Sequence, residues 1–351
     1  MPTSPPVAQL LALFGRADVI ELMVNDDGSC FVEQAGQGLR AVGKLENGMS
    51  YELLRALAGD SVEASLIKRP YADLVSSDGS RLHVLAPPIV KGLALTIRKK
   101  PLQRPRLEEL VANGTLTEGC AGLLAYAVEH GRNVLFVGGT SSGKTTLLNA
   151  LAALLPDDQR ILVLEDTPEL TLPQPHVMYL RTRHADPNGW ADVTLRELVI
   201  NTLRMRPDRI VVGEVRGSEA ADLLQAMNIG QEGVLSTLHA SSCREALMRL
   251  ETLVLMSGVD MPLRAVRGQI ASALDLIVFA ARLPDGSRRV MQVAEVTGLE
   301  LDNITMADLF KVEARKSPQG ATYQLRPTGS IPRFYEGLRQ AGLEPPLEFF
   351  K

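Results

Sequence analysis

The sequence predicts an α/β protein in which a smaller α+β domain at the N-terminus precedes a larger domain built on a mainly parallel sheet. Two observations support this prediction. The chain has 351 residues, more than a single hydrophobic core usually holds together, so two domains are expected. In the C-terminal part, short apolar runs alternate with helical segments, which is typical of parallel strands buried between two helical layers.

The predicted N-terminal domain spans residues 1–100. The turn sequence Asn25-Asp26-Asp27-Gly28 separates two runs with strand character, which is the pattern of a strand pair. The elements expected in this domain are strands at Val19–Val24, Ser29–Glu33, Arg81–Leu85 and Leu93–Arg98 and a helix at Tyr51–Leu57. Residues 101–106 belong to a stretch rich in proline and positive charge and are predicted to form a linker that acts as a hinge.

The predicted larger domain spans residues 107–351 and is expected to end in a helical subregion. One helix is well marked, because Thr194 and Glu197 have the spacing of a capping box and Pro207 follows the helical pattern as a stop. The expected strands are Val134–Val137, Ile161–Leu164, Ile210–Val212, Val234–Leu238 and Ile277–Phe279.

The most specific pattern lies between a predicted strand and a helix predicted at Thr145–Leu155. It is the run Gly138-Gly139-Thr140-Ser141-Ser142-Gly143-Lys144-Thr145, which matches the phosphate-loop pattern in full and is followed by Thr146. The glycines let backbone N–H groups turn toward a phosphate, and the helix N-terminus adds a favourable dipole. Lys144 is expected to reach the β- and γ-phosphates of a nucleotide, and the Thr145 hydroxyl is expected to bind Mg²⁺.

Two acidic residues and a histidine follow strands of the same predicted sheet. Glu165 comes directly after one strand, Glu214 follows another by way of Gly213, and His239 ends a third. Parallel sheets bind ligands at the carboxyl ends of their strands, so these side chains are expected near the phosphate loop. Glu165 is predicted to activate water, Glu214 to act on Mg²⁺ or water, and His239 to sense the γ-phosphate. Which of the two carboxylates takes the proton is left open.

Composition and charge disfavour several other classes of protein. The net charge is −4 and the isoelectric point is about 5.8, so no nucleic-acid partner is expected. Cys30, Cys120 and Cys243 have no disulfide or metal-binding spacing, which favours a reducing compartment such as the cytoplasm. The apolar run Gly268–Ala281 is shorter than the about 20 residues of a membrane-spanning helix and contains Asp275, so membrane association is expected only through partners.

Three motifs and the phosphate loop together resemble the secretion ATPases of conjugation, type IV secretion, type II secretion and type IV pili. The motifs are EDTPEL at residues 165–170, LRMRPDRIVVGEVRG at residues 203–217 and STLHA at residues 236–240. More narrowly, residues 249–290, AEVTGLE at residues 294–300 and PTGSIPRFYEGLRQAGLE at residues 327–344 resemble the tight-adherence (Tad/Flp) pilus assembly ATPases.

The resemblance implies a RecA-like P-loop ATPase domain, with ATP and Mg²⁺ held against an N-terminal domain that caps the nucleotide. It implies a homohexameric ring on the inner face of the membrane, bound to inner-membrane platform proteins, that powers pilus assembly and also retraction in some systems. Arginines at matching motifs are expected to reach the phosphates: Arg81 and Arg98 from the N-terminal domain, with Arg181, Arg183 and Arg206 as candidate arginine fingers. The chain departs from the family at Gly230-Gln231, where a glycine followed by a histidine is usual.

Three alternatives to a pilus motor share much of this pattern. One is a conjugation or protein-secretion ATPase with the same chemistry and another client. A second is a nucleic-acid translocase, since RecA-like rings also move DNA, although the acidic isoelectric point disfavours it. The third is a switch that binds ATP without hydrolysing it. Turnover, a response to DNA and the effect of deletion in the host separate these alternatives.

Overall fold

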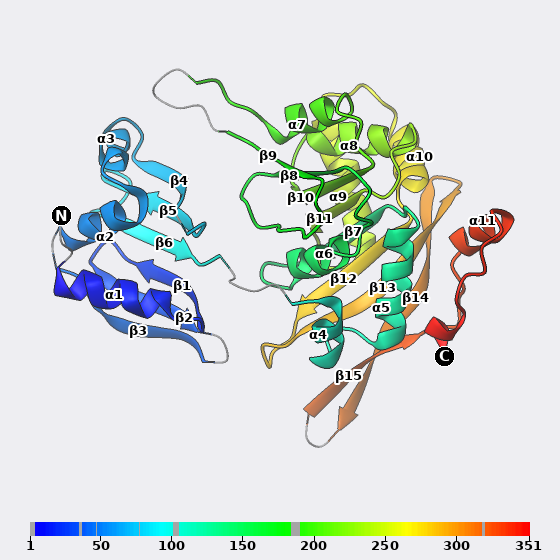
Figure 1. Cartoon of the computed structure of the whole chain (residues 1–351), viewed down its shortest axis with the longest axis horizontal. Helices are drawn as coiled ribbons and strands as arrows, with labels where there is room; N and C mark the ends of the chain where they lie inside the picture. The colour runs from blue at the N-terminus through cyan, green and yellow to red at the C-terminus, as the bar shows by residue number, and fades with distance from the viewer. Residues whose placement is uncertain are drawn as a thin grey trace. The chain divides into compact units, whose positions relative to one another are not determined.

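The computed structural model describes residues 4–34, 37–46, 48–76, 78–100, 105–183, 190–317 and 320–351 (Figure 1). The chain divides into two compact units, Met1–Gln103 with Ala185–Trp190 and Arg104–His184 with Ala191–Lys351, called here unit 1 and unit 2. Most of the predicted linker at residues 101–106 lies outside the described residues, because 101–104 are not among them.

Unit 1 contains a six-stranded antiparallel sheet in the order β3-β2-β1-β6-β5-β4. Its elements are α1 (Pro5–Gly15), β1 (Val19–Val24), β2 (Ser29–Gln34), β3 (Gly38–Lys44), α2 (Met49–Ala58), α3 (Ser61–Lys68), β4 (Tyr71–Val75), β5 (Arg81–Leu85) and β6 (Ala94–Arg98). The predicted strands and the predicted helix are confirmed. The sequence did not predict α1, α3, β3 and β4; β3 in particular is exposed along nearly all of its length and lacks the apolar alternation that marks a half-buried strand.

Unit 2 is an α/β unit around a nine-stranded sheet. Its helices are α4 (Leu107–Ala112), α5 (Glu118–Glu129), α6 (Lys144–Ala152), α7 (Leu195–Thr202), α8 (Glu219–Asn228), α9 (Cys243–Met256), α10 (Leu263–Ala273), α11 (Phe334–Gln340) and the 3₁₀ helix η1 (Glu348–Phe350). Its strands are β7 (Val134–Gly138), β8 (Ile161–Glu165), β9 (Val177–Arg181), β10 (Arg209–Val215), β11 (Leu235–His239), β12 (Leu276–Arg282), β13 (Arg288–Glu300), β14 (Asn303–Ser317) and β15 (Gly320–Pro327). All the strands predicted for this part of the chain are confirmed.

The large sheet is mixed, so the prediction of a mainly parallel sheet holds for its core, whereas three antiparallel strands, β13 to β15, precede the C-terminal helices α11 and η1. In the order β15-β14-β13-β12-β7-β11-β10-β8-β9, the strands from β12 to β9 are parallel, whereas β13, β14 and β15 are antiparallel. Short turns cause this reversal: Gly286 (φ +83°) lies between β12 and β13, and Leu301 (φ +55°) lies between β13 and β14. A connection of so few residues joins antiparallel strands only, because a parallel crossover needs a dozen residues or more.

The parallel part of the sheet is buried on both faces. Along β7, Val134 and Phe136 belong to one hydrophobic core, and Leu135 and Val137 belong to a second core on the other face. Helices α4, α5 and α6 contribute to the first core and α7 to α10 to the second, and Figure 1 shows them on opposite faces of the sheet. This three-layer packing leaves the carboxyl ends of the parallel strands as the place where polar side chains gather.

Two further predictions concern helices. The capping box at Thr194 is confirmed: its hydroxyl accepts from the backbone N–H of Glu197, whose carboxylate accepts in return, and α7 ends at Thr202, before Pro207. The apolar run Gly268–Ala281 is divided between α10 and β12. Across the part of the chain that the structure describes, the helices are too short or too polar to cross a membrane.

Candidate functional site

The phosphate-loop sequence forms the connection between β7 and α6. β7 ends at Gly138, and α6 begins at Lys144 after Gly143, which has a left-handed backbone (φ +96°). Among the described residues, no side chain caps the first turn of α6, so the N–H groups there are available to an anion. Ser141 is also left-handed (φ +58°), and left-handed residues are typical of loops whose N–H groups converge on an anion.

Two features of the loop limit which side chains fit. A side-chain carbon at Gly138 would overlap the carbonyl oxygen of Ala280 and the hydroxyl of Ser142, so this position requires glycine. The Ser142 Oγ is buried and has no hydrogen-bond partner among the described residues. A buried hydroxyl without a partner is costly, and a bound phosphate group is the kind of ligand that would satisfy it.

Lys144 is buried beside this loop, with 6% of its surface exposed. Its Nζ donates to the carbonyl oxygen of Gly139 at 2.9 Å and lies 3.5 Å from Nδ1 of His239. A buried ammonium group favours a negatively charged neighbour, because burial removes the water that would otherwise stabilise its charge. The lysine is therefore placed to receive the negative charge of a phosphate.

The strand ends bring the predicted catalytic residues together. His239, the last residue of β11, pairs in register with Gly138 on β7. Its Nε2 lies 3.0 Å from Oε1 of Glu214 near the end of β10, although the two groups are not aligned as a hydrogen bond. Lys144 at the start of α6, His239 on β11 and Glu214 on β10 thus form one chain of contacts.

Glu165 lies at the end of β8, next to β10, and is only 2% exposed. Its Oε1 accepts hydrogen bonds from the backbone N–H groups of Glu169 (2.8 Å) and Leu170 (2.7 Å). A side-chain carbon at Gly213 would lie 3.2 Å from Cγ of Glu165, so the absence of a side chain at this glycine gives the carboxylate its room. The neighbouring strand ends therefore bring Glu165 and Glu214 to the same edge of the sheet.

Arg216 is a site residue that the sequence analysis did not single out. Its Nη2 donates to Oε2 of Glu214 at 2.8 Å, and its Nη1 lies 3.7 Å from Oδ2 of Asp166, just after β8. It therefore connects the ends of β10 and β8 by charge. The sequence could have indicated this residue, because Arg216 lies two residues after Glu214 in the motif at residues 203–217. Which acid it contacts depends on the register of β10 and β8 and cannot be predicted from the motif.

Glu214 and His239 titrate differently from exposed groups. Burial alone would raise the pKa of Glu214, but Arg216, His239 and Lys144 together outweigh it and hold this pKa below its usual range. Burial and the charge of Lys144 lower the pKa of His239, and Glu214 offsets only part of that effect. The site therefore favours an ionised Glu214 beside a neutral His239 at neutral pH.

This arrangement predicts a pH dependence of stability. The folded-state pKa of His239 lies below its value of about 6.5 in the unfolded chain, so the unfolded chain binds its proton first as the pH falls. The free energy of unfolding should decrease from about pH 6.5 downward until His239 is protonated in the folded state as well. Thermal unfolding of His239→Gln, followed between pH 8 and pH 5, should show a smaller decrease than the wild type. His176→Gln serves as control, because His176 is exposed and contacts Arg160 instead. Equal curves of stability against pH for the wild type and His239→Gln would contradict the lowered pKa of His239.

The residues present fit the predicted Mg²⁺. Glu214 Oε1 is a buried carboxylate oxygen without a hydrogen-bond partner among the described residues, and oxygen ligands of this kind suit a hard cation. Thr145 is the second residue of α6, next to the loop. The described residues contain no group of three or more His, Cys, Asp or Glu that could hold a metal ion. A nucleotide-bound Mg²⁺ needs no such group, because phosphate and water oxygens complete its coordination.

The three candidate arginine fingers lie in different places. Arg181 ends β9 and pairs in register with Glu165, which places it at the edge of the site. Arg183 follows it, and its guanidinium donates to the carbonyl oxygen of Ala191. Arg206 precedes β10, at the amino end of the strand, whereas the site lies at the carboxyl ends. Arg206 therefore does not reach the site of its own chain, because strand β10 separates the two ends of the sheet.

Arg81 and Arg98 lie together in unit 1. They pair in register on the neighbouring strands β5 and β6, so their side chains leave the same face of the sheet. The Arg81 guanidinium lies 4.0 Å from Asp73, and the Arg98 charge partly offsets the burial that raises the pKa of Glu21. Each of the two cations thus has an acidic neighbour within unit 1, and their contact with a phosphate stays a prediction.

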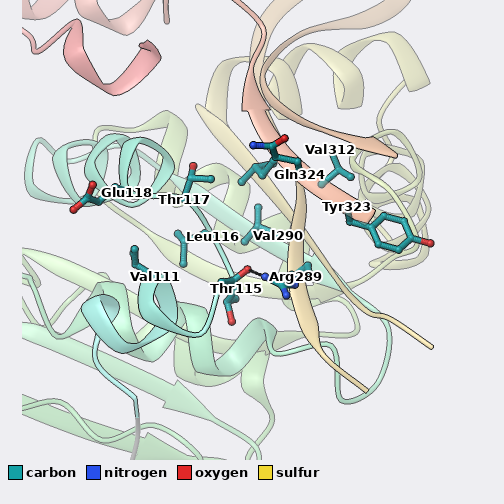
Figure 2. Close-up of a pocket in the computed structure, with 12 residues that line it drawn as sticks. Val111, Thr115, Leu116, Thr117, Glu118, Arg289, Val290, Val312, Tyr323 and Gln324 are labelled. Carbon is teal, nitrogen blue, oxygen red and sulfur yellow. Dashed lines mark hydrogen bonds between the residues drawn. The ribbon is translucent and has the colours of Figure 1, made fainter. Parts of the chain in front are cut away.

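A separate pocket of about 390 Å³ opens elsewhere in unit 2, between the loop that joins α4 to α5 and the strands β13 to β15 (Figure 2). Arg289 lines this pocket and donates a hydrogen bond to the carbonyl oxygen of Gly114. The residues that line it include none of the predicted site residues, so the pocket is not part of the phosphate-loop site.

Comparisons with known proteins identify the family of this chain. Residues 74–318, more than half of the chain, match the type II/IV secretion system protein family. The conjugal transfer protein TrbB of Rhizobium radiobacter is 35% identical over 298 residues, which cover 83% of this chain and 87% of that protein. The type IV secretion system protein VirB11 of Bartonella quintana is 31% identical over 278 residues, which cover 69% of this chain and 78% of that protein.

Two solved structures have the same fold at low sequence identity. The ATPase DotB of Legionella pneumophila is 21% identical with a TM-score of 0.58, covering 84% of this chain and 82% of that one. The pilus retraction motor PilT, solved with bound ADP, is 15% identical with a TM-score of 0.59, covering 98% of this chain and 88% of that one. Because a phosphate loop, two strand-end acids and a histidine meet in unit 2, and because the family match spans residues 74–318, the chain belongs to the type II/IV secretion system protein family.

Proposed function

We propose that this chain is an ATPase that hydrolyses ATP to ADP and phosphate at the carboxyl edge of the sheet in unit 2. The observation that carries the proposal is the contact chain from Lys144 through His239 to Glu214, beside an uncapped helix N-terminus. This combination supplies positive charge and N–H donors for phosphates on one side and carboxylates on the other. Phosphoryl transfer to water needs both.

Each residue has a proposed role. The N–H groups of Gly138 to Thr146 surround the phosphates, and Lys144 neutralises charge on the β- and γ-phosphates. Thr145 and Glu214 would hold Mg²⁺, which supplies further positive charge to the phosphate oxygens. Glu165 takes a proton from the attacking water while the water oxygen bonds to the γ-phosphorus. The bond between the γ-phosphorus and the oxygen that stays with ADP breaks. His239, neutral beside Lys144, contacts the γ-phosphate. The reverse assignment, with Glu214 as the base, stays open.

The proposed client is a tight-adherence (Tad/Flp) pilus, and the proposed assembly is a homohexameric ring at the cytoplasmic face of the inner membrane. The resemblance of residues 249–290 to ATPases of that pilus supports the client. In this proposal, residues 1–100 cap the nucleotide, residues 101–106 act as the hinge, and residues 107–351 are the RecA-like ATPase domain. Arg81 and Arg98 would add charge at the phosphates, and Arg181, Arg183 and Arg206 are candidates for contact with a neighbouring subunit. Platform proteins of the inner membrane are the proposed partners.

A second client has a specific observation in its favour. The relative TrbB is named as a conjugal transfer protein and is 35% identical over 83% of this chain. A conjugation or type IV secretion machine would use the same chemistry to move another cargo. The two proposals differ in the phenotype of the cell and not in the active site.

Two experiments test the function in order. Purified protein should release phosphate from ATP in a Mg²⁺-dependent reaction that added DNA does not stimulate; stimulation by DNA would favour a translocase, and binding without turnover would favour a switch. Deletion of the gene in its native host, with a complemented strain as control, should remove surface pili. Normal pili together with lost conjugation would replace the pilus client by the conjugation client.

A further inference from the structure

A hairpin in which the sequence analysis assigned no site residue contacts the phosphate loop. The hairpin consists of β12 and β13, and it meets the loop at two positions. The carbonyl oxygen of Ala280 fills the space beside Gly138, and the Nε of Arg288 donates to the carbonyl oxygen of Ser141 at 3.0 Å. A side-chain carbon at Gly143 would lie 3.3 Å from Cδ of Arg288, so the arginine also lies closely against the last residue before α6.

The segment that Arg288 contacts is the strained part of the loop. Ser141 has φ +58°, a conformation that residues with a side chain rarely adopt, and Gly143 has φ +96°. Between them, Ser142 has a buried hydroxyl without a hydrogen-bond partner among the described residues. A loop in such a conformation persists only where its surroundings hold it. The bond from Arg288 to Ser141 is a charge-assisted contact at the first residue of this segment.

Arg288 acts on the outer side of the loop. In a phosphate-binding loop the backbone N–H groups face the anion, so the carbonyl groups face away from it. Because Arg288 binds a carbonyl oxygen, it supports the loop from behind and does not itself occupy the place of a phosphate. Its neighbour in β13 points elsewhere, as strand alternation requires: Arg289 binds the carbonyl oxygen of Gly114 in the separate pocket (Figure 2).

We propose that Arg288 is a positioning residue that holds the Ser141–Gly143 turn in the conformation whose N–H groups converge on a phosphate. The proposal rests on the proposed ATPase function for its ligand, but Arg288 itself lies on β13 and not at the predicted catalytic strand ends. The chain offers a matched control, because Arg289 is the next residue, has the same side chain and binds a different loop.

The expected signature is a change in binding rather than in chemistry. Loss of a charge-assisted hydrogen bond that orders the loop should raise KM for ATP about tenfold, with kcat changed much less, because substrate and transition state lose the same contact. Arg288→Lys should recover part of the affinity, since its ammonium retains a charged donor. Arg289→Gln should have the KM of the wild type.

The experiment compares the wild type, Arg288→Gln, Arg288→Lys, Arg289→Gln and Lys144→Ala. Steady-state hydrolysis gives kcat and KM, and hydrogen exchange reports the amides of residues 139–143 with and without inorganic phosphate. Arg288→Gln should exchange these amides faster than Arg289→Gln does, and this readout needs no turnover. Equal KM and equal exchange in Arg288→Gln and Arg289→Gln would overturn the proposal. If the wild type released no phosphate from ATP, the proposed ATPase function would fail instead, and if Lys144→Ala hydrolysed ATP like the wild type, the assignment of the activity to the phosphate loop would fail.

Discussion

Replacing Lys144 with alanine should lower ATP turnover about 10²–10³-fold, the usual cost of removing one preorganised charge or donor at the reacting group. Lys144 is 6% exposed and its Nζ is held at the phosphate loop by the carbonyl oxygen of Gly139. The transferred phosphoryl group spreads negative charge over its oxygens, and no other lysine lies in the phosphate-loop motif. ATP affinity should fall as well, because the same charge contacts the bound triphosphate.

Phosphate release and nucleotide binding measure this effect directly. Lys311→Ala is a suitable control, since Lys311 is a largely exposed lysine that pairs with Asp308 on the same strand. The pKa of His239 gives an independent check of the contact between the two residues. The charge of Lys144 lowers this pKa, so the pKa of His239 should rise in Lys144→Ala. Turnover of Lys144→Ala equal to that of Lys311→Ala would remove the basis of the site.

Replacing Glu165 with glutamine should lower turnover about 10²–10⁴-fold while ATP binding is retained, because a general base typically contributes that much. Glutamine keeps a carbonyl oxygen that can accept the N–H groups of Glu169 and Leu170, so the fold around β8 should persist. The variant loses the negative charge and the ability to take a proton. A single-turnover assay with prebound ATP separates the two effects, since it measures chemistry without the binding step.

Two further variants decide between the carboxylates. Glu169→Gln is the matched control, because Glu169 contributes its backbone N–H to this contact and its side chain is not predicted to act. Glu214→Gln should weaken Mg²⁺-dependent binding as well as turnover, since Glu214 is the proposed metal ligand. If Glu214→Gln instead lost turnover with binding intact while Glu165→Gln remained active, the two roles would be exchanged.

The parts predicted correctly were those with a local signal. The phosphate loop is a contiguous run whose glycines and lysine have positions fixed by the chemistry of phosphate binding. The strands that precede Glu165, Glu214 and His239 are short apolar runs, and burial on both faces gives such runs a distinct pattern. Parallel strands then place their ends at one edge, which is why the acids and the histidine meet.

The parts that were missed depend on contacts between distant segments. The antiparallel strands β13 to β15 contain both polar and apolar residues, so they lack the pattern of a buried strand. Their direction follows from turns such as the one at Leu301, which has a left-handed backbone although it is not a glycine, so the sequence does not indicate a turn there. Arg288 lies 147 residues from Ser141 along the chain, so nothing in the local sequence indicates its contact. Arg216 was inside a recognised motif, but its link to Asp166 exists only because β10 and β8 are neighbours.

The close packing of Glu165 against Gly213, where a side-chain carbon would lie 3.2 Å from Cγ of Glu165, has a consequence for sequence evolution. A methyl group added at Gly213 on β10 would require the Glu165 side chain on β8 to shift by a few tenths of an ångström, which would disturb the position of the acid. We therefore expect positions 165 and 213 to covary among homologues, although they lie 48 positions apart in the sequence. Steric contact alone, without a hydrogen bond, would couple the two positions.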